Sequence, residues 1–371
     1  MKKLVILLLF AFQVFGQQKQ KVIFDCDLGD DIDDAYALGL LLTMQDRYEI
    51  LGITTCYGRT DDRARLAQKL LAETGQSNIP VYLGRNTSGK NERANWYAEQ
   101  FYWAEGFNLA LQKQSASEFI RTSLAKYPGE IVIFSVGPVT NFADIIDQDP
   151  EVLKKAKAIY AMFGSFRIGY SAKEPIDAEW NVAVDIPAAK KFVHSGAKII
   201  YAGLDVTAMV KLDRTNRDRI LQRQSPLTNA LSGLYVLWGN ETPTLFDPVA
   251  IGMEAYPSLF QTEKVHIDVD EKGFTRIIPN KSPNAEIGIN IDTPAFIERI
   301  MKKFLALPAI LLAFASSAYA QSVDFVEPKD GATVPATFKV KFAVDGMKVA
   351  PAGDMNEGTG HHHLLIDTAD I

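Results

Sequence analysis

Residues 22–38 read VIFDCDLGDDIDDAYAL, and this stretch carries the strongest structural signal in the chain. Its apolar start predicts a buried strand, and the run from Asp34 to Met44 predicts a helix with an aspartate at its N-terminus. The turn between them places six aspartates within ten positions: Asp25, Asp27, Asp30, Asp31, Asp33 and Asp34. Carboxylates this close repel one another unless a cation or solvent relieves them. Because the turn lies between two apolar elements, we expect a cation there.

The residue types in the turn favour calcium or magnesium over zinc, because carboxylate oxygens are hard ligands. The spacing is not that of an EF-hand, since Leu28 and Gly29 interrupt the required alternation of acidic positions. The two cysteines, Cys26 and Cys56, lie in apolar strand-like runs. We expect both as buried thiols that pack like small hydrophobic residues.

Further apolar, β-branched runs alternate with helical patterns over residues 17–300. The predicted strands are KVIFDCD, EILGITTCYG, IPVYLG, EIVIFSVG, AKAIYAMFG and AKIIYAGLD, each ending near Gly or Asp. This order predicts an α/β fold with an open, mostly parallel, Rossmann-like sheet and helices on both faces. Ligands of such sheets bind beyond the carboxyl ends of the strands. Near the end, residues 264–278 predict a hairpin that turns at Lys272-Gly273.

Composition narrows the class of partner. The chain has 371 residues, 47% hydrophobic and 23% charged, with a formal net charge of −6, which is typical of a globular protein. No block of Lys and Arg stands out, and a nucleic-acid polymer needs a basic face. A small molecule is therefore the expected ligand.

Two segments have the pattern of a secretory signal peptide. Residues 1–16 combine a basic start with an apolar run, so we expect an exported protein, periplasmic or secreted. Residues 301–320 repeat the pattern in mid-chain, and residues 321–371 predict a partial β-rich domain. The simplest hypothesis is that two reading frames have been joined. The alternative is a membrane anchor between two exported domains.

The tail carries one further motif, EGTGHHHLLID, at residues 357–367. It resembles the first part of a small exported bacterial domain of unknown function. The run His361 to His363 offers metal ligands, but the start of an exposed strand explains it equally well.

The acidic turn resembles the signature of the inosine–uridine preferring nucleoside hydrolase family, in a longer form with Gly-x-Asp-x-Asp-Asp. Three later segments resemble that family in the same order: IVIFSVGPVTNFADI at 131–145, PIDAEWNVAVDIPAA at 175–189 and PTLFDPVAI at 243–251. The resemblance covers roughly residues 21–300. It implies calcium-dependent hydrolysis of the N-glycosidic bond of ribonucleosides, and a homo-oligomer, either dimer or tetramer.

The resemblance also implies roles for individual residues. The expected calcium ligands are Asp27, Asp34, the backbone carbonyl of Val136, and Asp247, and Asp27 would also be the catalytic base. The expected ribose ligands are Asp33, Asn181 and Glu179. The turn is two residues longer than the usual family form. We assign the paired aspartates to Asp33 and Asp34 because they lead directly into the helix.

One departure concerns the leaving base. Many members of the family have a histidine immediately before the last aspartate, whereas this chain has Phe246. We expect Phe246 and Trp238 to contact the base, and Tyr170 or Tyr235 offers a hydroxyl for proton donation or a ring for stacking. For these aromatic residues, ordinary core packing is the competing interpretation.

Two other functions remain open from the sequence. VIFDCD also resembles the start of haloacid-dehalogenase-like phosphatases, but that interpretation leaves Asp33, Asp34 and PTLFDP without a role. A catalytically impaired nucleoside-binding protein would retain the cation site and lack base release.

The hypothesis of joined frames makes a direct prediction. In mass spectrometry of the native product, we expect no peptide that spans Glu298 to Asp324. Detection of such a peptide would show that both parts are translated as one chain.

Overall fold

The computed structural model describes residues 18–89, 92–108, 110, 112–306, 322–329, 332–335, 337–345, 348–349 and 359–360. Contacts divide the chain into two compact units, Met1–Ala306 and Leu307–Ile371. The predicted signal peptide at 1–16, positions 307–320 of the second apolar segment, and His361 to His363 lie outside the described residues. No helix among the described residues has the length and apolar character needed to cross a membrane.

The first unit is built on an eight-stranded sheet with the order β3-β2-β1-β4-β5-β6-β10-β7. Its strands are β1 (Gln20–Cys26), β2 (Tyr48–Thr55), β3 (Val81–Leu83), β4 (Ile131–Ser135), β5 (Ala158–Met162), β6 (Ile199–Ala202), β7 (Phe260–Val265) and β10 (Ala285–Ile291). Neighbouring strands are parallel except β7, which pairs antiparallel with β10. The predicted fold class, an open and mostly parallel α/β sheet, is confirmed.

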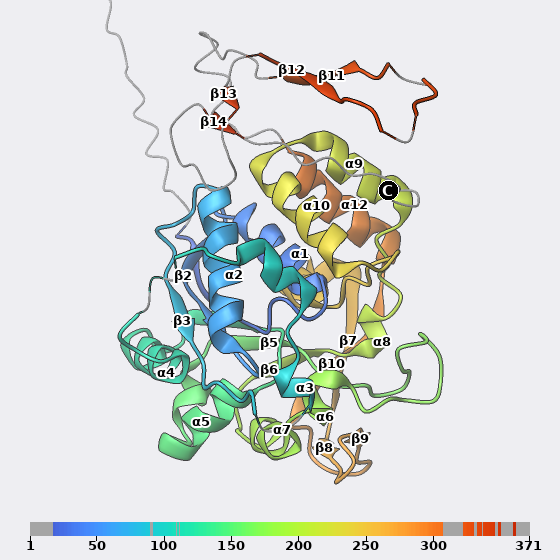
Figure 1. Cartoon of the computed structure of the whole chain (residues 1–371). Helices are drawn as coiled ribbons and strands as arrows, with labels where there is room; N and C mark the ends of the chain where they lie inside the picture. Colours follow the sequence, from blue (N-terminus) through green and yellow to red (C-terminus); the bar gives the residue numbers. More distant parts are fainter. Residues whose placement is uncertain are drawn as a thin grey trace, which may run out of the picture. The chain divides into compact units, whose positions relative to one another are not determined.

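Helices cover both faces of this sheet (Figure 1). One face packs against α1 (Asp33–Leu42), α2 (Thr60–Glu73), α10 (Pro226–Trp238), α11 (Phe246–Ala255) and α12 (Thr293–Leu305). The other packs against α4 (Ala116–Lys126), α5 (Thr140–Gln148) and α7 (Ile186–Val193). Successive side chains of a strand point to opposite faces, so Val22 and Phe24 enter the first core and Ile23 the second. Both cores therefore follow from the apolar run of residues 22–24 in β1, which is buried on both faces of the sheet.

The chain reverses its direction of sheet growth between β1 and β4. It runs from β1 outward to β2 and β3, and then returns to place β4 on the other side of β1. The loops that leave the carboxyl ends of these two strands therefore turn to opposite faces and leave a crevice between them. Asp27 directly follows β1 and Val136 directly follows β4, so both lie at this crevice.

Three further features concern the C-terminal part of the first unit. The hairpin predicted at Lys272-Gly273 is confirmed: β8 (Ile267–Val269) pairs antiparallel with β9 (Thr275–Ile277), and Gly273 has a φ of 81°. Strands β7 and β10 were not predicted from the sequence, because their polar and glycine positions interrupt the apolar pattern. Helix α12 runs five residues beyond position 300, and its Met301 and Phe304 are each only 2% exposed.

The remaining short elements are α3 (Glu92–Asn95), η1 (Glu99–Ala104), η2 (Val152–Lys155), α6 (Trp180–Ala183), α8 (Leu204–Thr207), α9 (Arg214–Arg223) and η3 (Pro257–Leu259). In the second unit, β11 (Ser322–Glu327) pairs antiparallel with β12 (Lys341–Asp345), and β13 (Lys348–Val349) pairs with β14 (Thr359–Gly360).

Close packing after β4 yields a testable prediction. A Cβ atom on Gly137 would lie 2.6 Å from Asp27 Oδ1 and 2.6 Å from Cys56 Sγ. We expect Gly137→Ala to lower the free energy of unfolding by about 1–3 kcal/mol, because a well-packed region does not accept an added methyl group. Urea denaturation measures this. The control is Gly233→Ala in α10, where the new Cβ meets the Trp103 ring at ordinary contact distances, 3.5 Å to Nε1 and 3.8 Å to Cδ1, and no loss is expected.

Candidate active site

A cavity of about 350 Å³ lies at the crevice beyond the carboxyl ends of the strands. The residues that the sequence assigned to the cation, the ribose and the base contacts line it: Asp27, Asp33, Asp34, Val136, Glu179, Asn181, Trp238, Phe246 and Asp247. Of the two tyrosines considered for the leaving base, Tyr170 lines the cavity and Tyr235 does not. These residues come from segments far apart in the sequence, and the topology of the sheet brings them together. The volume is in the range of sites that hold small molecules.

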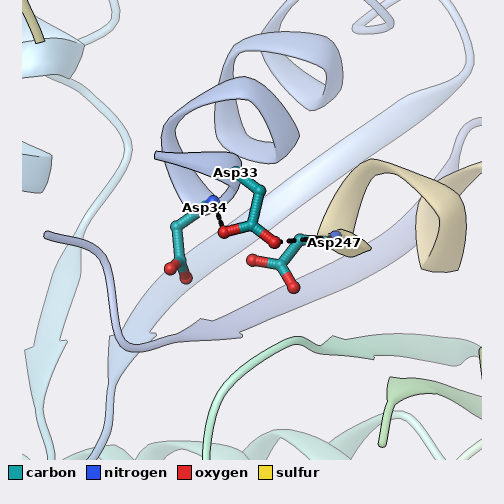
Figure 2. A group of neighbouring side chains, drawn as sticks. All are labelled: Asp33, Asp34 and Asp247. Atoms are coloured by element: carbon teal, nitrogen blue, oxygen red, sulfur yellow. Dashed lines mark hydrogen bonds between the residues drawn. The ribbon is translucent and has the colours of Figure 1, made fainter. Parts of the chain in front are cut away.

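Three buried carboxylates converge at one side of this cavity, those of Asp33, Asp34 and Asp247 (Figure 2). One oxygen of each lies within 4.8 Å of the others. Asp33 and Asp34 begin α1, and Asp247 is in the first turn of α11, so two helix N-termini face the same point. The Asp33 carboxylate accepts the backbone N–H groups of Asp34 and Asp247, each at 3.2 Å. The partial positive charge of a helix N-terminus favours acidic side chains there.

The triad fits a hard divalent cation. All three side chains are buried, and burial raises the pKa of each carboxyl well above its usual range. The Oδ1 atom of Asp34 is buried and has no hydrogen-bond partner among the residues that the structure describes. Buried carboxylates need a counter-charge, and an unpartnered oxygen among three converging acids is a free ligand position for calcium or magnesium.

Asp27 lies in the same cavity, at the end of β1, and is 5% exposed. Burial raises the pKa of its carboxyl to about 8, against the opposing effect of the Arg63 guanidinium. Its charge in turn raises the pKa of Asp34. The triad thus contains Asp33, which the resemblance assigned to ribose, and leaves out Asp27, which the resemblance assigned to the cation. Asp27 lines the same cavity.

Glu179 and Asn181 also line the cavity. Glu179 caps α6, and its carboxylate accepts the N–H groups of Gly164 and Asn181 at 2.9 and 2.8 Å. Burial raises the pKa of Glu179 to about 7. The Asn181 amide donates to the carbonyl of Val136 and to that of Met162, each at 3.0 Å. Asn181 therefore ties the ends of β4 and β5 to this wall.

Aromatic side chains form the rest of the wall. Phe246 lies edge-on to Tyr170, with ring centroids 5.9 Å apart, and Tyr170 accepts the N–H of Trp180 through its hydroxyl at 2.8 Å. Trp238, at the end of α10, also lines the cavity. Tyr235 donates its hydroxyl to the Glu241 carbonyl at 2.7 Å and is not among the lining residues.

Some lining residues were not anticipated. Met162 and Trp180 could have been found, because one ends the predicted strand β5 and the other lies between Glu179 and Asn181. Trp96 and Asn240 lie on irregular segments, where no periodicity indicates which way a side chain points.

The fold and the cavity define a class: a doubly wound α/β protein with an acidic small-molecule site at the switch point of its sheet. The chain belongs to the inosine–uridine preferring nucleoside hydrolase family, whose sequence profile matches residues 22–298, and it is a nucleoside N-ribohydrolase family enzyme. Residues 340–371 match a domain of unknown function (DUF4399).

Individual relatives span nearly the whole first unit. A probable uridine nucleosidase 2 of Arabidopsis thaliana is 27% identical over 320 residues, which cover 77% of this chain and 98% of the relative. The pyrimidine-specific ribonucleoside hydrolase RihA of Citrobacter koseri is 26% identical, with 76% and 97% covered. Among solved structures, a plant nucleoside hydrolase, PpNRh1, superposes with a TM-score of 0.69 at 22% identity, covering 78% of this chain and all of that one. The last likeness supports the fold.

The buried carboxylates predict how stability depends on pH when no cation is bound. Because burial raises the pKa of Asp33, Asp34 and Asp247, the folded state holds protons that the unfolded state releases above about pH 4. Asp27 behaves in the same way, with a folded-state pKa of about 8. The contribution of these four carboxyls to stability is therefore present at low pH and is lost as the pH rises toward their folded-state pKa values. In chelator, we expect the melting temperature to fall between pH 6 and pH 8.

Thermal unfolding in chelator measures this slope. Each proton held only by the folded state contributes about 1.4 kcal/mol per pH unit. Asp34→Asn should flatten the slope, and saturating calcium should do the same in the unmodified protein. The exposed Asp218→Asn serves as the control and should leave the slope unchanged. A melting temperature that rises with pH in chelator would contradict the prediction.

Proposed function

We propose that this protein hydrolyses the N-glycosidic bond of ribonucleosides in a calcium-dependent reaction that releases ribose and a free base. The observation that carries the proposal is the buried triad of Asp33, Asp34 and Asp247 inside a cavity of nucleoside size. Membership of the nucleoside hydrolase family supports the reaction class. The named activities of the relatives, a uridine nucleosidase and a pyrimidine-specific ribonucleoside hydrolase, support ribonucleosides as the substrates.

The proposed cation ligands are Asp27, Asp34, Asp247 and the Val136 carbonyl. When bound there, calcium would orient ribose hydroxyls and lower the pKa of water. Asp27 is the proposed base that takes the proton from the attacking water, for which it needs only hydrogen-bond reach. Asp33 is assigned to the ribose hydroxyls, and its position within the triad also allows contact with the cation.

The acidic wall also suits the charge that develops on the sugar. Cleavage of a glycosidic bond passes through an oxocarbenium-like transition state, in which positive charge gathers on the ribose ring. Fixed carboxylates around the ring stabilise that charge more than they stabilise the neutral substrate. Glu179 and Asn181, which line the same cavity, are also assigned to ribose hydroxyls.

The base is proposed to bind against the aromatic wall, with Phe246 and Trp238 as contacts. The residue immediately before Asp247 is Phe246 and not a histidine, so no imidazole at that position can donate a proton to the leaving base. Tyr170 contacts Phe246 and lines the same wall, and its hydroxyl accepts the Trp180 N–H, which leaves its own proton free of that bond. Tyr170 is therefore the candidate for contact with the leaving base.

Export and assembly are further parts of the proposal. The signal-like residues 1–16 support a periplasmic or secreted protein that acts on external nucleosides. Peptide mapping of the native product would locate its first residue, and a product that retains Met1 would contradict export through this leader. A dimer or tetramer follows from the family resemblance. Light scattering of the purified protein would decide the oligomeric state.

A panel of ribonucleosides tests the proposed reaction. Full-length protein is incubated with inosine, adenosine, uridine and cytidine, with calcium or with chelator, and the free base is quantified by chromatography. We expect base release with calcium and none with chelator. Asp27→Asn should lower kcat by about 100- to 10,000-fold, the usual contribution of a general base. The exposed Asp218→Asn is the matched control and should retain full activity.

Other outcomes would identify the alternatives. Calcium-dependent binding of nucleosides without release of base would indicate a nucleoside-binding protein. Release of phosphate from nucleoside monophosphates, with nucleosides left intact, would indicate a phosphatase. Either result would overturn the proposed hydrolysis.

A further inference from the structure

The loop of residues 28–31, between β1 and α1, is held in place by two buried side chains from other parts of the fold. From α2, Arg63 donates to both carboxylate oxygens of Asp30, at 3.0 and 2.9 Å, and to the carbonyl oxygens of Asp27 and Leu28. The carboxylate of Asp30 is thus paired with a guanidinium. The positive charge of Arg63 in α2 therefore balances one of the negative charges of the acidic turn.

The second side chain is Gln100, in η1, which is 1% exposed. Its amide nitrogen donates to the carbonyl oxygens of Gly29 and Asp31, each at 2.8 Å. Two carbonyl acceptors can be satisfied together only by a group with two hydrogens, so the nitrogen side of the amide must face the loop. Within the described part of the chain, the amide oxygen of Gln100 has no hydrogen-bond partner that would favour the opposite orientation.

The packing beside Gln100 leaves the loop little freedom. Gly29 has a φ of 124°, and a Cβ atom there would lie 2.3 Å from Cε1 of Phe101, the residue after Gln100. Arg63 lies over the same ring, 5.8 Å from its centroid. The loop is therefore enclosed by α2 on one side and by η1 on the other. A shift of η1 would move the carbonyls that flank Asp30.

The chain segment that contains Gln100 also reaches the cavity. We call residues 92–104, which comprise α3 and η1, the aromatic segment. Its Trp96 lines the cavity and is 43% exposed. Its Arg93 lies over the ring of Trp180, another lining residue, at 5.1 Å from the centroid. The aromatic segment thus contacts the acidic loop through Gln100 and the cavity wall through Trp96 and Arg93.

We propose that Gln100 is a positioning residue that couples the cation site to the aromatic segment. Its two hydrogen bonds fix the loop between Asp27 and Asp33, and so set how Asp27 faces the triad. Occupancy of the cation site and the placement of Trp96 then depend on each other, because one side chain connects both. The inference rests on the proposed function only in requiring that a cation binds the triad. Mutation of a residue that orients a metal ligand without touching the metal typically lowers metal affinity by about 10- to 100-fold.

The test compares Gln100→Met with the unmodified full-length protein. Methionine keeps the length and approximate volume of glutamine and removes both donors. Calorimetric titration of calcium into chelator-treated protein should show a Kd raised roughly 10- to 100-fold in this variant. The matched control is Gln68→Met, because Gln68 in α2 donates to the Ala110 carbonyl at 2.7 Å, outside the cavity. Its calcium Kd should stay within about twofold of the unmodified value.

Tryptophan emission provides a second readout that does not require catalysis. Calcium should change the emission of the unmodified protein, and Trp96→Phe should remove most of that change. In Gln100→Met, the change should be reduced even at saturating calcium. A merely structural role would lower the melting temperature in chelator and leave both the calcium Kd and the Trp96 signal as they are.

The outcomes separate the two proposals. If the unmodified protein binds calcium and Gln100→Met binds it equally well, the coupling is wrong and the cation site stands. If the unmodified protein binds no calcium, both are overturned. If Gln100→Met is not recovered as folded protein, the coupling is tested by comparing the calcium-induced emission change of the unmodified protein with that of Trp96→Phe. Absence of a calcium-induced change that depends on Trp96 would then refute the coupling.

Discussion

The repulsion among buried carboxylates is the constraint on which this site depends. One carboxylate oxygen from each of Asp33, Asp34 and Asp247 lies within 4.8 Å of the other two, and Asp27 lines the same cavity. Burial disfavours the charged form of all four carboxylates. The stability to hold them together comes from the two hydrophobic cores on either side of the sheet. A cation that binds the triad would remove part of the repulsion. The arrangement is therefore least favourable when the cavity holds neither cation nor protons.

The central part of the fold could be predicted from the sequence because its strands are buried on both faces. Such strands appear as near-continuous apolar runs. Strands β4, β5 and β6 have this character along most of their length, and β1 and β2 have it in their central residues. The edge was not predictable in the same way. Strand β10 contains Gly288 and Asn290, and β7, at the edge of the sheet, has four consecutive polar residues from Gln261 to Lys264. Their pairing is decided by tertiary contacts that no local pattern contains.

The residues of the candidate site also differ in whether a local sequence pattern could predict them. The acidic turn is contiguous, so most of its chemistry could be predicted from one stretch. Asp247 is 214 positions from Asp33, and only the resemblance to a family indicated that the two belong together. Trp96 and Gln100 gave no such signal, since a glutamine in a polar segment looks like any other. Its role follows from where its amide points, and a sequence does not record that.

The last helix has a practical consequence for how the first unit can be separated from the tail. The second signal-like segment suggests a domain boundary at residue 300. A chain that ended there would lose the last five residues of α12. Met301 and Phe304 would be lost, and both fill the core shared with α1 and α10. Losing a buried aromatic residue alone costs about 3–5 kcal/mol, a large part of the stability of an ordinary domain. An expression boundary for the isolated unit therefore belongs after Leu305, even though those five codons also begin the tail's leader-like segment.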